Sequence, residues 1–274
     1  MRILPGAMAV LIACGPAGRE NDTVDAPGSQ IDAPATAGMS RVYGHSGDTL
    51  YRLDPTNLAA TIIGSMPGLD TGLLDLAVDK DDRLVGITRL KLYSLSATTG
   101  APMLIRDLSA SAQNFTSLSY VPGAAMSDPD ILISANDQGN VFQINETTGT
   151  ATTIGNYGMH NGMQVTSSGD LFGVRGLGVF ATVDVGTGTM DYLARIDPAN
   201  NWKATPLPNA TGFDKIFGLG FWGGTIYGFV DDGFDAGTGK LIQIDPTTGI
   251  ATVLSSGPVR WFGAGVTTSA PILL

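Results

Sequence analysis

The chain has 274 residues and a mass of 28.3 kDa, and 43% of its residues are hydrophobic. It can therefore bury a sizeable core as one large domain or two smaller ones. Fifteen Lys and Arg stand against 25 Asp and Glu, and the formal net charge of -10 excludes a partner that requires phosphate neutralisation, such as nucleic acid. The 37 glycines are about double the usual share. Tight turns tolerate glycine better than helices do, so the composition favours an all-β chain.

The first residues are typical of an export signal. Arg2 is the only charged residue among the first 18, and residues 3–13 are apolar apart from the break at Pro5-Gly6. Eleven residues with a rise of ~1.5 Å each cannot cross a hydrocarbon core of ~30 Å. We therefore predict that residues 1–13 form a signal peptide and not a lasting membrane span.

The end of this segment resembles the lipobox of bacterial lipoproteins. Leu11-Ile12-Ala13-Cys14-Gly15 leads from small and aliphatic residues directly into the only cysteine of the chain. The resemblance implies lipidation of the Cys14 thiol, cleavage before Cys14 and acylation of the new amino terminus, which would anchor the protein in a membrane. Gly15 is compatible with sorting to the outer membrane of the cell envelope. The alternative is an ordinary cleaved signal with an incidental thiol.

Residues 14–40 are expected to be a disordered tether behind the lipidated cysteine. The segment is rich in Ala, Pro, Gly, Asp and Ser, and it contains no aromatic residue. Such a composition cannot bury enough apolar surface to order the chain. The folded domain is therefore predicted to comprise residues 41–274.

This domain contains five copies of one pattern. An aliphatic residue precedes an acidic or small polar residue at the end of a strand, a turn follows, and the chain returns in a second strand. The five anchors are Leu53-Asp54, Leu95-Ser96, Ile144-Asn145, Val183-Asp184 and Ile244-Asp245. Their spacings are 42, 49, 39 and 61 residues, close to the ~40 to 50 residues of a four-stranded propeller blade.

The pattern predicts a five-bladed β-propeller that is closed by its C-terminus. The first copy lacks an innermost strand, and residues 261–266 match residues 216–221 almost position for position. The C-terminal strand should therefore complete the N-terminal blade, which removes free sheet edges. Ile196-Asp197-Pro198 imitates an anchor, but no aromatic residue or Gly stands at the expected offsets. We interpret it as part of a long connection over residues 194–212.

A β-solenoid or a sandwich would be the competing fold, but solenoid coils are shorter and sandwiches do not repeat internally. The repeats over residues 41–274 are broadly similar to those of the SMP-30/gluconolactonase, NHL and YVTN groups of propellers. The resemblance implies a fold more than an activity, because these groups include metal-dependent lactonases as well as non-catalytic binding modules.

Ligand-binding residues are expected on two sets of loops, those that enter an innermost strand and those between the second and third strands. Several Asp and Asn oxygens there could hold Ca²⁺ or another divalent cation, or they could be present only because turns favour them. Asp75 should point towards the central channel, and His160 could serve as a base or ligand. The candidates are Asp75, Asn136, Asp137, His160, Asn161, Asp231 and Asp232; Arg89, Arg175 and Arg260 lie on the same predicted loops.

Two functions remain open from the sequence. The first is a monomeric, lipid-anchored, non-enzymatic propeller that presents its loop face to a protein or glycan. The alternative is a divalent-cation-dependent hydrolase similar to the lactonases, with Asp75 and Asn161 among the metal ligands. The sequence contains no nucleophile elbow, zinc-protease motif, P-loop or dinucleotide fingerprint, and its two histidines and single cysteine exclude a His-rich zinc site or a Cys-His dyad.

Overall fold

The computed structural model describes residues 41–54, 56–111, 113–233 and 237–272. The predicted signal peptide and tether, including Cys14, lie outside the described residues. Nearly all of the regular structure in the described part is β, with two 3₁₀ turns of three residues each, η1 (Ser109–Ser111) and η2 (Pro198–Asn200). Within these ranges no helix is long and apolar enough to span a membrane.

The strands form five antiparallel sheets, named here from the innermost strand outwards. Blade 1 contains β21 (Gly263–Val266), β1 (Val42–His45), β2 (Thr49–Asp54) and β3 (Ala59–Ser65). Blade 2 contains β4 (Asp75–Val78), β5 (Leu84–Ile87), β6 (Lys91–Leu95) and β7 (Pro102–Asp107). Blade 3 contains β8 (Ser119–Val121), β9 (Ile131–Ala135), β10 (Asn140–Ile144) and β11 (Ala151–Asn156). Blade 4 contains β13 (Met163–Val174), β14 (Gly178–Val185), β15 (Tyr192–Asp197) and β16 (Lys203–Pro206), with the short β12 (Met159–His160) added beside β13. Blade 5 contains β17 (Ile216–Trp222), β18 (Thr225–Asp231), β19 (Gly239–Ile244) and β20 (Ala251–Gly257).

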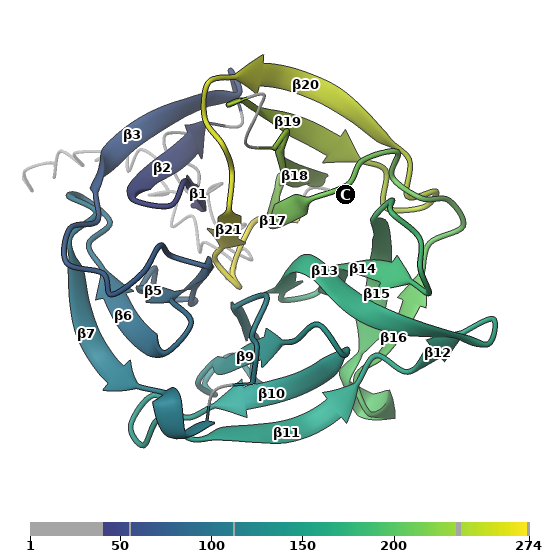
Figure 1. Ribbon diagram of the computed structural model, residues 1–274, viewed down its shortest axis with the longest axis horizontal. Helices are drawn as coiled ribbons and strands as arrows, with labels where there is room; N and C mark the ends of the chain where they lie inside the picture. Colours follow the sequence, from purple (N-terminus) through teal and green to yellow (C-terminus); the bar gives the residue numbers. More distant parts are fainter. Residues whose placement is uncertain (1–40, 55, 112, 234–236, 273–274) are drawn as a thin grey trace, which may run out of the picture. The chain divides into compact units, whose positions relative to one another are not determined.

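Figure 1 shows the five sheets arranged in a ring around a central axis, with one strand of each next to that axis. The chain is a five-bladed β-propeller, as the repeats predict. We call the face with the turns that enter the innermost strands the upper face; the turns between second and third strands lie on the same face. The turns between first and second strands lie on the opposite, lower face.

The C-terminal strand closes the ring in blade 1. Val42 pairs with Val266 and Gly44 with Ala264 in the antiparallel ladder between β1 and β21. The backbone N–H of Phe262 also donates to the His45 carbonyl oxygen at 2.9 Å. The predicted closure is therefore confirmed, and the last segment of the chain supplies the innermost strand that the first segment lacks.

Local chemistry explains the turn that follows the third strand of each blade. In blade 5 the Asp245 carboxylate accepts the backbone N–H groups of Thr247 and Thr248 at 2.8 and 2.7 Å. Gly249 then adopts a φ of 84°, a conformation that glycine reaches without steric cost. The residues at this place in the five blades all have positive φ: Leu58, Gly100, Gly149, Asn201 and Gly249.

The predicted alignment of blade 4 is wrong. Its anchor is Ile196-Asp197, which the sequence analysis interpreted as part of a connection, and not Val183-Asp184. β15 ends at Asp197, whose side chain accepts the Ala199 N–H at 3.1 Å, and Asn201 takes the left-handed position with a φ of 53°. The motif was hidden because Asn replaces Gly and the turn is one residue longer. With Ile196 in place of Val183, the anchor spacings become 42, 49, 52 and 48 residues.

This shift also moves two strand assignments. Leu171-Phe172-Gly173 belongs to β13 and forms the innermost strand of blade 4, whereas the sequence prediction made it the second strand. Residues 194–212 are not one long connection, because most of β15 and all of β16 lie within them. The first part of β13 and β12 instead form a hairpin that extends beyond the blade (Figure 1).

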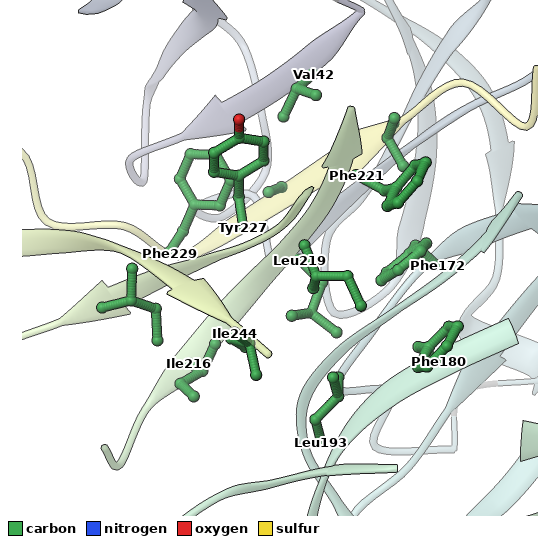
Figure 2. Close-up of a cluster of buried hydrophobic side chains, with 14 of the residues drawn as sticks. Val42, Phe172, Phe180, Leu193, Ile216, Leu219, Phe221, Tyr227, Phe229 and Ile244 are labelled. Carbon is green, nitrogen blue, oxygen red and sulfur yellow. The ribbon is translucent and has the colours of Figure 1, made fainter. Parts of the chain in front are cut away.

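Apolar side chains between neighbouring blades form the core. Between blades 4 and 5 the Phe172 ring stacks against Phe180 and Phe221, with ring centroids 5.5 and 6.3 Å apart (Figure 2). Between blades 5 and 1 the Phe229 ring meets the edge of Trp261 at 5.2 Å. Each blade thus buries both faces of its inner strands, which explains why these strands read as continuous apolar runs.

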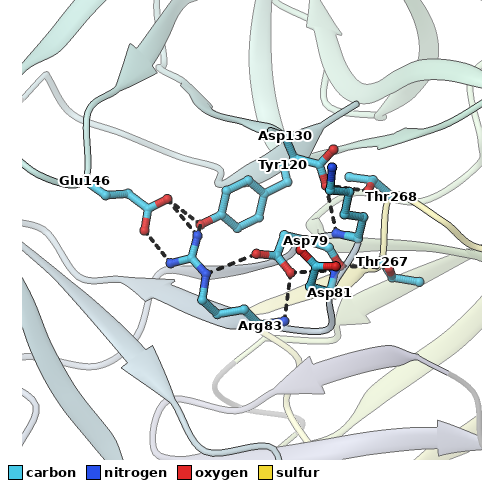
Figure 3. A network of polar contacts seen from close by, with 9 residues as sticks. Asp79, Asp81, Arg83, Tyr120, Asp130, Glu146, Thr267 and Thr268 are labelled. Carbon is cyan, nitrogen blue, oxygen red and sulfur yellow. Dashed lines mark hydrogen bonds and ion pairs between the residues drawn. The ribbon is translucent and has the colours of Figure 1, made fainter. Parts of the chain in front are cut away.

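Polar contacts on the lower face fasten the C-terminal residues to blades 2 and 3 (Figure 3). The Thr267 hydroxyl donates to the Asp79 carbonyl oxygen at 2.8 Å, and the Thr268 hydroxyl donates to Asp130 at 2.6 Å. Beside them, Arg83 forms an ion pair with Glu146 of blade 3 at 2.5 Å. Ring closure therefore rests on the Thr267 and Thr268 hydroxyl groups as well as on the β1–β21 ladder.

Candidate functional site

A cavity of about 770 Å³ opens on the upper face, above the upper ends of the innermost strands. Drug-sized ligands typically occupy pockets of roughly 300 to 1,000 Å³. All five blades contribute to its lining, which consists of Thr71, Leu73, Leu74, Arg89, Leu90, Asn114, Phe115, Thr116, Asp137, Ser168, Gly169, Phe217 and Phe262. The loop face that the sequence identifies as the ligand face therefore carries a pocket formed jointly by the repeats.

A layer of five equivalent residues lies at the upper end of the innermost strands. These residues are Gly263, Asp75, Ser117, Asp170 and Gly218 in blades 1 to 5. Each of the five directly follows a residue of the cavity lining, and Leu74 and Gly169 precede the two acidic members, Asp75 and Asp170. Both carboxylates are completely buried, so this layer places two acidic groups beneath the pocket.

Asp75 and Asp170 connect neighbouring blades through the backbone. Asp75 accepts the N–H of Leu76 at 2.8 Å and that of Leu118, in the next blade, at 2.6 Å. Asp170 accepts the N–H of Leu171 and that of Leu219, again in the next blade, each at 2.5 Å. The same contact thus recurs between blades 2 and 3 and between blades 4 and 5.

The two carboxyl groups also interact electrostatically with each other. Burial raises the pKa of both groups well above the usual value, and the charge of Asp170 raises the pKa of Asp75 further. Two adjacent carboxylates in a low-dielectric interior cannot both stay ionised without a compensating charge. The raised pKa values therefore favour a proton that is held between the two side chains.

His45 lies close to the same layer and is completely buried. Its Nδ1 is 2.7 Å from the Ser46 carbonyl oxygen, an arrangement that requires a proton on Nδ1, and Nε2 has no partner within the described ranges. Burial lowers the pKa of His45 to about 4, so the imidazole is neutral at pH 7. A Cβ atom at Gly263 would lie 2.3 Å from His45 Nε2 and 2.5 Å from Asp75 Oδ1, so only glycine fits there.

Two candidate residues from blade 3 have different positions. Asn136 is buried and its amide holds the β9–β10 turn, accepting the N–H groups of Gln138 and Asn140 and donating to the Gln113 carbonyl oxygen at 3.0 Å. Asp137 is exposed and lines the cavity. Asn136 therefore has a structural task, whereas Asp137 can meet a ligand.

The two candidates from blade 5 are engaged in ion pairs at the upper face. Asp231 accepts two hydrogen bonds from Arg260 at 2.8 and 2.7 Å, and Asp232 pairs with Lys240. The Arg260 guanidinium also lies over the Phe262 ring, 5.0 Å from its centroid. These acidic groups are neutralised by side chains of the protein and fix the wall of the cavity beside Phe262.

His160 and Asn161 are not at the start of an innermost strand, where the sequence alignment placed them. They lie at the end of the β12–β13 hairpin, with His160 paired to Met163 and its Nε2 3.0 Å from the Asn161 amide nitrogen. Arg175 is also misplaced by that alignment. Its guanidinium donates to the Gly123 carbonyl oxygen at 3.1 Å on the lower face. Both errors follow from the one-strand shift in blade 4.

The side chains do not fit the metal site that the resemblance to the lactonases implies. The predicted ligands Asp75 and Asn161 are in different parts of the molecule, and each oxygen of Asp75 already accepts a backbone N–H. Within the residues that the structure describes, no group of three or more His, Cys, Asp or Glu side chains is arranged to hold an ion. The geometry therefore gives no support to the metal-dependent hydrolase.

Sequence reasoning missed Asp170 and Asp191. Asp191 accepts the Ile216 N–H at 2.8 Å, and burial raises its pKa to about 7. A signal for Asp170 existed, because alignment on Ile196-Asp197 places Asp170-Leu171 at the position of Asp75-Leu76. For Asp191 no comparable repeat position would have indicated burial.

Comparisons with known proteins name no function for the chain. No protein-family model matches it, and no curated protein matches it. Many solved structures resemble it, and three are described here. A TolB-like protein from Agrobacterium tumefaciens has 12% identity and a TM-score of 0.46, and the match covers 80% of this chain and 79% of that one. A protein of unknown function from Bacteroides caccae has 8% identity and a TM-score of 0.43, with 79% and 72% covered. The WD40 β-propeller domain of Doa1 has 18% identity and a TM-score of 0.38, with 81% and 66% covered.

Proposed function

We propose that this protein is a lipid-anchored, extracytoplasmic binding module that holds a ligand in the cavity of its upper face. The observation that carries the proposal is the cavity of about 770 Å³ lined by all five blades. A propeller fold suggests a binding or scaffold role, and a pocket at the convergence of its loops is the usual place for a ligand.

The residues around the pocket favour binding over catalysis. Asp75 and Asp170, the only pair of carboxyl groups beneath it within the described ranges, use all four oxygens to accept backbone N–H groups. Asp231 and Asp232 are held in ion pairs. A general acid or base must reach the substrate, and these four groups are committed to holding the blades and the rim.

The pocket is tested with the neutral fluorescent probe N-phenyl-1-naphthylamine. We expect saturable binding to the wild-type protein and at least a tenfold weaker affinity in Thr71→Trp, because the indole would fill the mouth. Thr56→Trp, an exposed change in the turn after β2, is the control and should bind as the wild type does. Equal affinity in all three proteins would refute the pocket as the binding site.

The lipid anchor is a separate prediction that rests on the lipobox resemblance of residues 11–15. Wild-type protein expressed in a bacterium should sediment with the membrane fraction, and intact-mass spectrometry should find acyl chains on an N-terminus that begins at Cys14. Cys14→Ser should leave the protein unacylated and in the soluble fraction. Wild-type protein that is unmodified and soluble after signal cleavage would favour the ordinary signal peptide.

A further inference from the structure

We infer that the ligand of the upper-face cavity is an apolar organic acid with a single anionic group, held by Arg89. This inference rests on the proposed binding function and names the class of ligand. Two observations support it: the walls of the cavity are mainly apolar, and its rim carries one cationic side chain.

The walls of the cavity are mainly apolar and come from four blades. Six hydrophobic side chains line it: Leu73, Leu74, Leu90, Phe115, Phe217 and Phe262. The three phenylalanines belong to blades 3, 5 and 1, so aromatic surface faces the cavity from three separate directions. An aliphatic chain or an aromatic ring would bury its surface against these walls, at about 25 cal/mol for each Å² removed from water.

Arg89 is the only cationic side chain in the lining within the described ranges. It is exposed in the turn between β5 and β6, and no hydrogen bond or ion pair is found for it among the described residues. Three other cations of the upper face are paired, Lys91 with Asp70, Lys240 with Asp232 and Arg260 with Asp231. In a protein of net charge -10, an unpaired guanidinium at an apolar pocket is suited to one carboxylate, which it can bind through two parallel hydrogen bonds.

Asp137 limits the charge of the ligand. It is the only acidic side chain in the described lining, and its carboxylate would repel a second anionic group in the same cavity. A compound with two or three negative charges, such as a nucleotide, is therefore disfavoured. A monoanion with an apolar body satisfies both the single cation and the walls.

Two probes that differ by one sulfonate test this inference. 1-Anilinonaphthalene-8-sulfonate has the same aromatic body as N-phenyl-1-naphthylamine, together with one anionic group. In the full-length chain, Arg89→Met keeps most of the side-chain length and removes the charge. We expect it to weaken binding of the sulfonate about tenfold while the affinity for the neutral probe changes less than twofold. Arg106→Met, on the outer strand β7, should leave both affinities unchanged.

Carboxylic acids then identify the head group. Dodecanoate should displace the neutral probe from the wild-type protein at a lower concentration than dodecanol does, and Arg89→Met should abolish this difference. If both probes bind but Arg89→Met leaves the ratio of their affinities unchanged, the assignment of the anionic group is wrong and the binding function stands. If neither probe binds to the wild-type protein, the proposed binding function itself fails.

Discussion

Deletion of residues 261–274 is expected to abolish cooperative folding. The deletion removes β21 and with it the buried side chains of Trp261, Ala264 and Val266. It also leaves β1 without its inner partner and removes the Thr267 and Thr268 hydrogen bonds to blades 2 and 3. Fully burying one large apolar side chain contributes ~1.5 to 3 kcal/mol, whereas the net stability of a domain is only ~5 to 15 kcal/mol. Circular dichroism and limited proteolysis would measure the loss.

A circular permutant provides the matched control for this deletion. Joining the C-terminus to Arg41 and opening the chain at Gly68, an exposed position with no atom close to where a Cβ would stand, retains residues 41–274 and makes β21 and β1 consecutive. We expect this permutant to fold with a melting temperature near that of the parent domain. A truncated chain that melts like the full-length protein would contradict the closure.

A single substitution tests how closely β21 packs against blade 2. A Cβ at Gly265 would lie 2.5 Å from Leu76 Cδ1 and 2.6 Å from the Leu76 carbonyl oxygen, so Gly265→Ala must separate blades 1 and 2. Overpacking of this kind costs about 1 to 3 kcal/mol. Gly257→Ala has no neighbour within 4 Å and should leave the unfolding free energy unchanged within ~0.5 kcal/mol.

Asp170→Ala is expected to lower the free energy of unfolding by about 2 to 5 kcal/mol. The change leaves the backbone N–H groups of Leu171 and Leu219 without their acceptor, and each buried unsatisfied donor costs ~1 to 3 kcal/mol. In a domain of this size the melting temperature should fall by roughly 5 to 15 °C. Asp137→Ala, which removes an exposed carboxylate, is the control. Equal melting temperatures for Asp170→Ala and the wild type would show that the inter-blade contact contributes nothing.

The pH dependence of stability provides a second measurement on the same pair. The folded protein retains a proton on Asp75 and Asp170 because their pKa values are raised, whereas the unfolded chain releases it above about pH 4. This proton therefore contributes stability that is present below pH 4 and is lost as the pH rises through the raised pKa. Asp170→Ala removes one carboxyl group and the repulsion on Asp75, so the stability of this variant should fall less steeply as the pH rises above about 4. Urea denaturation at several pH values would measure the slopes, and parallel slopes would contradict proton sharing.

Much of the fold could be predicted because each blade repeats a local signal. The turn after β19 is determined by residues close together in sequence, because Asp245 accepts N–H groups of the turn and Gly249 adopts a positive φ. Such local signals can be recognised in a single sequence. The predicted alignment of blade 4 was wrong because Asn201 takes the positive-φ turn position that glycine takes in three other blades. The backbone φ of 53° shows that Asn201 is equivalent to those glycines, whereas its residue type does not.

By itself, the sequence determined the number of blades, the closure of the ring by its C-terminal strand and the face on which the loops converge. These features follow from residue order and spacing. Only the tertiary structure decided which side chains meet, because Asp75 and Asp170 are 95 residues apart in sequence and come together only through the curvature of the ring. It likewise paired Asp231 with Arg260 and left Arg89 beside an apolar cavity. Burial and charge pairing depend on neighbouring residues from other blades, and a local sequence pattern does not identify those neighbours.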